Sequence, residues 1–238
     1  GNLAYNTANF SVAFKVIGGT SYVFLVSEAN TYDVVIRRGT ISGTTITFDS
    51  AVTVLDGTSA SDKYIMPAVG LDSNDKVWTA AFKDLGNVGD RYLATARRTT
   101  NAGSATLAFD SSSAIGKPSV AVSGISIAPT NSAKALIVVS GESGANAIAY
   151  EYDGTSSWSR TSGSDGYGWE SFAKYGVDAQ VAAVVADASG NVYFGGFISD
   201  AGGVRANNIA RWNGTSWSPL GAGTDNTVRA LALDSSGN

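Results

Sequence analysis

Four-part groups of strand-like segments recur along the chain at a nearly constant spacing, and this repeat limits the fold more than any other feature. The first segments are "SVAFKVI" (11–17), "PAVGLD" (67–72), "GISIAP" (124–129) and "VAAVVAD" (181–187). The second segments are "SYVFLVS" (21–27), "KVWTAAF" (76–82), "KALIVVS" (134–140) and "NVYFGGF" (191–197). These second segments begin 55, 58 and 57 residues apart, which indicates an internal repeat.

A third and a fourth segment complete each repeat. The third segments are "DVVIRRG" (33–39), "RYLATARR" (91–98), "AIAYEYDG" (147–154) and "IARWNG" (209–214). The fourth are "TTITFDSAV" (44–52), "ATLAFDSS" (105–112), "SSWSR" (156–160) and "TSWSPLG" (215–221). Short stretches rich in Gly, Asn, Asp and Ser join them, and no stretch has helical periodicity. Each repeat is therefore predicted to be a blade of four short antiparallel strands, which is the unit of a β-propeller.

The predicted protein is thus all-β, with four propeller blades whose first strands lie nearest a common axis. The blades are expected at 11–55, 62–115, 119–162 and 178–222, and residues 1–10 are expected to be an outer strand or a linker. "VRALALDSSGN" (228–238) repeats the opening of a blade, which predicts the first strand of an incomplete fifth blade. The pattern predicts part of a larger ring, whose open faces are covered by further blades of the same polypeptide or by neighbouring subunits.

Composition excludes several classes of function. The net charge is −4 without a basic stripe, which argues against nucleic acid as a partner. No apolar run approaches the roughly 18 residues that membrane insertion as a helix requires. The chain has neither Cys nor His, so we expect no disulfide, no Ser-His-Asp chemistry, no transition metal and no redox cofactor. These absences favour a binding or structural module over a hydrolase.

Two family resemblances refine this picture. Residues 181–238, which include "ADASGNVYFGGFISDAGGVRANNIARWNGTSWSPLGAG", resemble the kelch-like repeats of secreted and surface-attached propellers, which implies an extracellular or cell-surface protein. The turns "YDGTSSW" (152–158) and "WNGTSW" (212–217) resemble the Asp box of sialidases, in which an aspartate of the turn caps neighbouring backbone. Asn213 replaces that aspartate in the second turn. Because Asp boxes are structural, this resemblance implies no catalytic residue.

The candidate binding site lies on the upper face, where the loops between second and third strands and the links between blades are expected to emerge. These connections are longer than the turns of the opposite, lower face. The link 161–180 carries Asp165, Tyr167, Trp169 and Glu170, and the other upper loops add Asp84, Glu142, Asp200 and Arg205. Aromatic rings stack on the C–H face of a sugar and carboxylates accept its hydroxyls, so a glycan is the favoured ligand. Burial of Trp169 and Phe172 between two blades is the alternative explanation.

Three functions remain open from the sequence. The first is a non-catalytic module that binds glycan or a surface protein through its upper face. The second is a structural repeat of a surface layer, fibre or filament. The third is a sialidase-like glycoside hydrolase, for which Glu142, Asp165 and Glu170 would have to converge, with Tyr167 as nucleophile.

Two further motifs have simpler interpretations. The arginine pairs at 37–38 and 97–98 fit a sialidase, but they end third strands on the lower side and their members point to opposite faces, so we expect pairing with Asp. The turns "DSND", "DASGN" and "DSSGN", and the loop "SDAGGVRANN" (199–208), are candidates for a structural Ca²⁺. Each turn has one or two carboxylates, which favours Asx turns instead.

Overall fold

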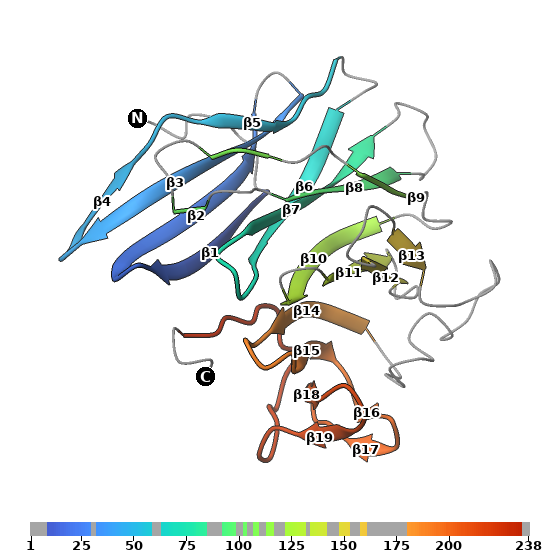
Figure 1. Cartoon of the computed structure of the whole chain (residues 1–238). Helices are drawn as coiled ribbons and strands as arrows, with labels where there is room; N and C mark the ends of the chain where they lie inside the picture. Colours follow the sequence, from blue (N-terminus) through green and yellow to red (C-terminus); the bar gives the residue numbers. More distant parts are fainter. Residues whose placement is uncertain are drawn as a thin grey trace.

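The computed structural model describes residues 9–29, 32–58, 63–84, 92–98, 102–103, 107–109, 113–116, 122–131, 134–141, 148–152, 158–160 and 180–234. The regular elements of these residues are all β-strands (Figure 1). A helix able to cross a membrane is absent from this part of the chain. The strands form four antiparallel sheets and one small hairpin.

The strands follow the predicted order of four to a blade. Blade one comprises β1 (Phe10–Ile17), β2 (Thr20–Glu28), β3 (Val34–Ser42), β4 (Thr45–Phe48) and β5 (Val52–Leu55). Blade two comprises β6 (Lys63–Leu71), β7 (Val77–Asp84), β8 (Tyr92–Arg98) and β9 (Ser113–Gly116). Blade three comprises β10 (Val122–Asn131), β11 (Lys134–Gly141), β12 (Ile148–Tyr152) and β13 (Trp158–Arg160). Blade four comprises β14 (Gln180–Ala186), β15 (Val192–Phe197), β18 (Ile209–Trp212) and β19 (Trp217–Pro219), with a hairpin of β16 (Asp200–Ala201) and β17 (Val204–Arg205).

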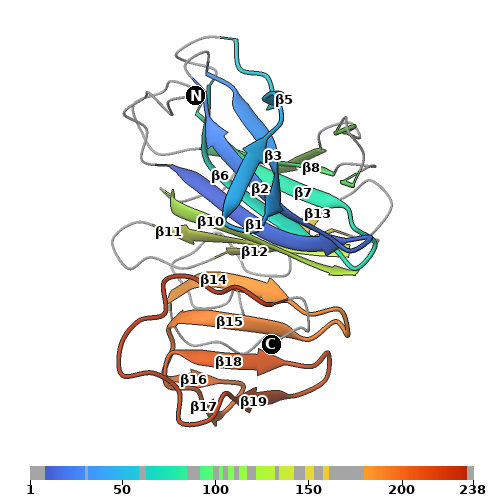
Figure 2. The same ribbon diagram turned by 90° about the vertical axis from the view of Figure 1, so that its left-hand side faces the viewer.

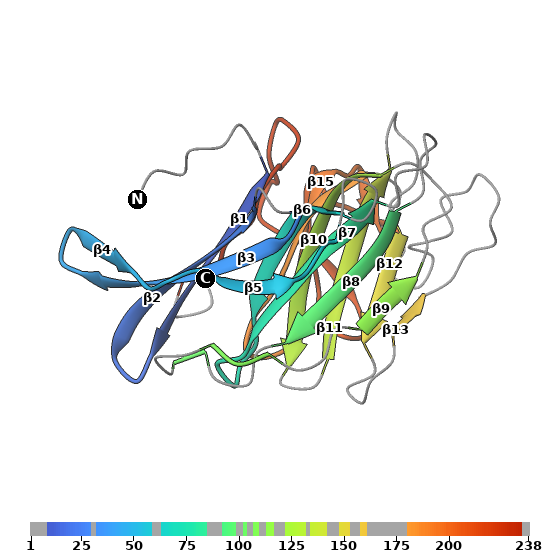
Figure 3. The same cartoon turned by 90° about the horizontal axis from the view of Figure 1, so that it is seen from above.

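Within each sheet, neighbouring strands pair antiparallel in sequence order. The all-β antiparallel propeller predicted from the repeat is therefore confirmed. The first strands of successive blades are neighbours, because β6 contacts both β1 and β10, and β10 contacts β14. In the view from above, the turns between first and second strands of blades one and two lie together at the bottom (Figure 3).

A serine on the first strand joins one blade to the next at two equivalent places. The backbone N–H of Val69 donates to Oγ of Ser11 at 3.2 Å, which joins β6 to β1. The backbone N–H of Val184 donates to Oγ of Ser126 at 3.1 Å, which joins β14 to β10. Both pairs are separated by 58 residues in sequence, so the repeat length corresponds to a repeated contact.

The cores lie between the blades. We call the side of a blade that meets the following blade its leading face, and the opposite side its trailing face. Between blades one and two, the cluster comprises Phe24, Val26, Val34, Ile36, Val54, Leu55, Val69, Val77, Ala81, Ala102 and Leu107. Between blades three and four, Ala128 and Leu136 pack with Val184, Val192 and Phe194. Burial of both sheet faces explains why these strands are apolar along their length.

The fourth strand of blade two lies later in the chain than predicted. The expected strand at 105–112 contains a bridge at Phe109, whereas β9 pairs with β8 at residues 113–116. The fourth strand of blade one is also divided, into β4 and β5, which pair with different parts of β3. The division follows "FDS" in both blades. In blade one, the backbone N–H of Asp49 donates to the carbonyl of Arg38 at 2.9 Å, and β4 ends at the preceding residue.

Residues 228–234 form no strand, unlike the predicted first strand of a fifth blade. The backbone N–H of Val228 donates to the carbonyl of Gly196 at 3.1 Å, and the side chains of Val228 and Leu231 lie against Gly195. The segment thus covers part of the leading face of blade four and passes beside β14 and β15 (Figure 2). No neighbouring strand in the described residues pairs with it, and a strand needs such a partner.

Candidate functional site

The predicted site residues divide into those that the structure describes and those that it does not. Asp165, Tyr167, Trp169, Glu170 and Glu142 lie outside the described residues. Asp84 is the last residue of β7, where its backbone pairs with Lys63 and Tyr92. Asp200 and Arg205 are described completely, and the structure brings these two together.

The loop between the second and third strands of blade four is an ordered hairpin. Asp200 pairs with Arg205 and Ala201 with Val204 across β16 and β17. Gly202 and Gly203 form the two-residue turn, with φ values of 57° and 80°. A left-handed conformation at both turn positions suits the twist of a hairpin and favours glycine. The sequence motif "DAGGVR" therefore fixes the exposed side chains of Asp200 and Arg205 on one short hairpin.

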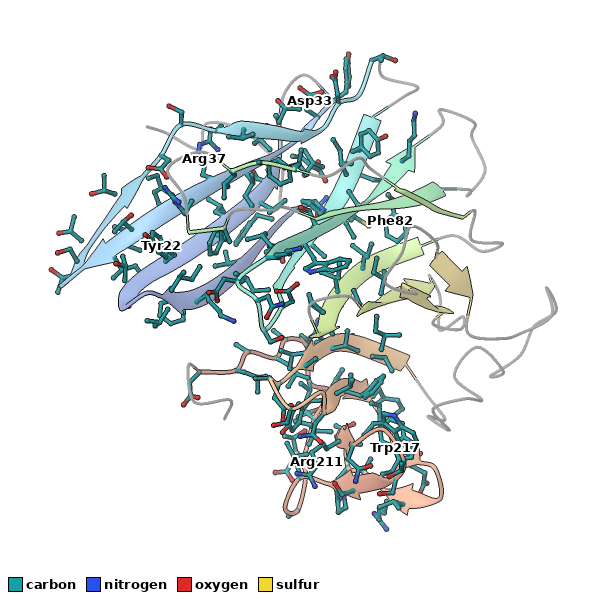
Figure 4. The ribbon with its side chains drawn as sticks, in the orientation of Figure 1. Tyr22, Asp33, Arg37, Phe82, Arg211 and Trp217 are labelled. Carbon is teal, nitrogen blue, oxygen red and sulfur yellow. The ribbon has the colours of Figure 1, made fainter. Side chains whose placement is uncertain are left out.

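An aromatic cluster supports this hairpin from blade four. A Cβ atom added to Gly202 would meet Cδ1 of Trp217, so the turn lies directly on the indole ring. The ring centroid of Trp217 is 5.0 Å from that of Phe194 and 5.4 Å from that of Trp212. Trp217 lies low in blade four beside the hairpin strands (Figure 4). Because Phe194 is fully buried, the cluster connects the hairpin to the blade core.

Two asparagines hold the other end of the loop. Asn207 and Asn208 have φ values of 46° and 73°, which asparagine tolerates better than most residues. The side-chain amide of Asn207 donates to the carbonyl of Ala222 at 2.7 Å, and that of Asn208 donates to the carbonyl of Thr224 at 2.8 Å. Nε of Arg205 donates to Oδ1 of Asn207 at 3.0 Å. The amide oxygen proposed for Ca²⁺ thus accepts from a cationic side chain instead.

Phe197 is a candidate ligand-binding residue that the sequence prediction missed. It is the last residue of β15, it is 65% exposed, and it lies three residues before Asp200. Its neighbour in the strand alternation, Phe194, points to the buried trailing face, so Phe197 lies on the opposite side. The signal was the spacing of the two phenylalanines in "VYFGGF". An exposed ring beside a carboxylate and a guanidinium can stack on a sugar and hydrogen bond to its hydroxyls.

On the lower face, the turns at Asp72 and Asp187 have the same hydrogen-bond pattern. Oδ1 of Asp72 accepts the backbone N–H groups of Asn74 and Lys76, at 2.9 and 3.0 Å. Oδ1 of Asp187 accepts those of Ser189 and Asn191, both at 2.9 Å. The predicted Asx turns are therefore confirmed at both positions.

The second carboxylate oxygen of each aspartate binds a residue of the next strand. Oδ2 of Asp72 accepts from the indole N–H of Trp78 at 3.0 Å. Oδ2 of Asp187 accepts from the hydroxyl of Tyr193 at 3.1 Å and from the amide of Asn191. Burial raises the pKa of Asp187, but hydrogen bonds from Asn191, Tyr193 and Ser189 outweigh it and hold this pKa below 3.8. These carboxylates stabilise turns and strand starts.

The arginine pair of blade one is divided between two faces, as predicted. Arg38 is buried on the leading face, where Nη2 lies 2.7 Å from Oδ2 of Asp49 and Nη1 donates to the carbonyl of Ala102 in blade two at 3.3 Å. Its guanidinium also lies 5.1 Å from the ring centroid of Tyr22. Arg37 is opposite Leu25 on the other face of β3. Arg38 therefore pairs within and between blades, and it is not open to a ligand carboxylate.

Glu28, at the upper end of β2, likewise serves the backbone. Its Oε1 accepts the backbone N–H of Met66 at 2.8 Å and the side-chain amide of Asn9 at 3.0 Å. Met66 has a φ of 52°, at the bulge of β6. The carboxylate thus stabilises an unusual backbone conformation where blade two begins.

Sequence comparisons do not assign the chain to a family. No protein-family model matches it, and no curated protein sequence matches it either.

Known structures show similarity of fold. One neighbour is a Hadza microbial sialidase, with a TM-score of 0.50 and 10% identity over 87% of this chain. Another is the α-L-arabinofuranosidase of Podospora anserina in complex with cellotriose, with a TM-score of 0.51 and 13% identity over 97% of this chain. The chain spans 43% of the sialidase and 72% of the arabinofuranosidase. At these identities the comparison establishes the β-propeller fold.

Proposed function

We propose that this protein is a non-catalytic propeller module that binds glycans through its upper face, outside the cell or at its surface. The observation that carries the proposal is the supported hairpin of blade four. It presents the exposed ring of Phe197 three residues before Asp200, whose partner across the hairpin is Arg205. A rigid aromatic surface beside hydrogen-bonding groups is the usual basis of sugar recognition.

Two further observations support this proposal. The upper-face link 161–180 contains Tyr167 and Trp169 beside Asp165 and Glu170, so the same residue types recur on the connection that precedes blade four. The two fold neighbours are a sialidase and an arabinofuranosidase in complex with cellotriose, and both are named for sugars. A glycan is therefore the favoured ligand, ahead of a surface protein.

The roles of the charged side chains favour binding over hydrolysis. Asp72 and Asp187 hold turns, Asp49 pairs with Arg38, and Glu28 accepts a backbone N–H. A sialidase-like hydrolase remains the alternative that Glu142, Asp165, Tyr167 and Glu170 would have to carry. The second alternative, a structural repeat of a surface layer or filament, is favoured by the exposed apolar side chains of blade one, including Phe10 and Phe14.

The test is a glycan array of neutral and sialylated oligosaccharides, probed with wild type and variants. We expect wild type to bind a limited set of glycans. Phe197→Ala and Trp169→Ala should each weaken binding about 10-fold or more, because one stacked ring contributes about 1–3 kcal/mol when it is buried by ligand. The matched control is Phe48→Ala, which removes another exposed ring in blade one and should leave binding unchanged.

Mass spectrometry of the bound glycan separates the alternatives. An intact glycan after prolonged incubation supports a binding module, whereas cleavage would establish a hydrolase. Absence of binding to every glycan, with wild type folded, would remove the proposal and leave the structural role.

A further inference from the structure

One face of blade one is apolar and uncovered. Its exposed side chains come from the first and the fourth strands of the sheet. They are Phe10 (65% exposed), Val12 (52%), Phe14 (45%), Val16 (36%), Ile46 (46%) and Phe48 (44%). We call this surface the blade-one trailing face.

Strand register shows that these side chains form one continuous surface. Phe14 is opposite Val23, and Val23 is opposite Gly39. Gly39 is in turn opposite Phe48. A Cβ atom on Gly39 would lie 2.7 Å from side-chain atoms of both Val23 and Ile46, and 2.9 Å from Phe48. The side chains thus close over the glycine and make an unbroken apolar layer across four strands. Figure 4 shows Arg37, the charged residue opposite Leu25 on this face, on β3.

The same face is buried in other blades. On the trailing face of blade two, Val77, Thr79 and Ala81 are fully buried against blade one. On that of blade four, Phe194 is fully buried and Val192 is 4% exposed. The repeat therefore builds this face to be covered by another sheet, and blade one has the residue types without the cover.

We propose that a second copy of the chain covers the blade-one trailing face, so that the protein is a dimer with the two faces packed against each other. The arrangement is isologous, since the same patch serves both subunits, which is the commonest symmetry of homo-oligomers. Sheets with apolar faces pack in this way when their strand directions lie within about 30° of one another. Low charge at the centre of the patch, with one arginine, matches the composition of interface cores.

The size of the face is sufficient. β1 has eight residues, so at about 3.3 Å per residue it is roughly 26 Å long, and four strands spaced by about 4.8 Å are roughly 19 Å wide. Each subunit would therefore contribute about 500 Å², or about 1,000 Å² for the pair, which reaches the lower limit for a specific interface. Projecting rings such as Phe10 and Phe14 add to this area.

The experiment is light scattering coupled to size exclusion, from micromolar to the highest soluble concentration. Wild type is expected at twice 24.4 kDa, and Phe14→Glu at 24.4 kDa. The matched control is Thr47→Glu on β4, which is exposed and alternates with Ile46 and Phe48 onto the opposite face. This control should remain dimeric.

A second variant and a second measurement guard against simple misfolding. Ile46→Glu, at the outer strand, should also be monomeric, and both monomeric variants should retain the circular dichroism spectrum of wild type. Hydrogen exchange of β1 amides should be slower in wild type than in Phe14→Glu. A monomeric wild type would overturn the proposal and point to a blade of another chain, or of a longer form of this one, as the cover. A dimer that survives both glutamate variants would overturn it as well.

Discussion

Gly195 and Val228 are in contact across the leading face of blade four, so closely that a Cβ atom at residue 195 would lie 2.5 Å from Cγ1 of Val228. Gly70 in blade two has the same relationship with blade three, because its Cβ position lies 2.6 Å from Cδ of Pro129. A glycine on one blade thus admits a side chain from the next segment of the repeat. Val228 occupies the place of a following blade although residues 228–234 form no strand.

Gly195→Ala should detach residues 228–234 from blade four. Overpacking of a filled site costs about 1–3 kcal/mol, and the segment is held by few other contacts. We expect limited trypsin digestion to cut after Arg229, an exposed residue, faster in the variant than in wild type. Gly195→Ala combined with Val228→Ala should restore resistance because the smaller side chain makes room. Equal cleavage of Gly195→Ala and the double variant would contradict this explanation.

Ser126→Ala should destabilise the junction between blades three and four. The backbone N–H of Val184 would lose its acceptor in a partly buried position, at a cost of about 1–3 kcal/mol. For a chain of this length, that corresponds to a fall in Tm of roughly 2–10 °C by calorimetry. Ser189→Ala is the control, because Ser189 is exposed in a lower turn where its backbone N–H, not its hydroxyl, makes the hydrogen bond to Asp187. A similar Tm for both variants would show that the serine does not join the blades.

Arg38→Lys should fail to replace the arginine. The guanidinium bonds to Asp49 and to the carbonyl of Ala102 in blade two, and a single ammonium does not match this forked geometry. We expect a loss of about 1.5–3 kcal/mol in the free energy of unfolding, measured by urea denaturation. Arg37→Lys, a half-buried arginine on the other face, should cost less than about 1 kcal/mol. Equal losses at the two positions would disprove the inter-blade role of Arg38.

Much of the architecture could be predicted because the repeat is visible in local residue types. Alternating apolar segments at 21–27 and 191–197 fix second strands, and Asp72 and Asp187 fix the turns that precede them. Position was lost where a contact between strands decides it. Asp49 ends β4 by binding Arg38, and neither residue alone indicates that the strand breaks there.

The candidate site was less predictable. Loop length identified the upper face, but the pairing of Asp200 with Arg205 depends on two glycines that form a turn on Trp217. Phe197 resembled a core residue by type. Its exposure follows from which side of β15 is buried, and this requires knowing how blade four packs against blade three.

Asp187 should make stability depend on acid pH. Its pKa in the folded protein lies below 3.8, so it contributes stability above pH 3.8, and this contribution is lost as the pH falls through the folded pKa. Asp187→Asn should therefore be less stable than wild type at neutral pH, with a difference that shrinks below pH 3.8. Urea denaturation at several pH values measures it, and Asp225→Asn, at an exposed position, is the control. A difference that stays constant down to pH 2 would contradict the assigned hydrogen bonds.

The central claim, that the upper face binds glycan, is tested most directly by NMR shift mapping with the strongest ligand from the glycan array. The account predicts that the perturbed backbone amides cluster around Phe197, Asp200 and Arg205 and in the link 161–180, and that Phe197→Ala weakens these shifts. Shifts that cluster instead at the lower turns of Asp72 and Asp187 would contradict it.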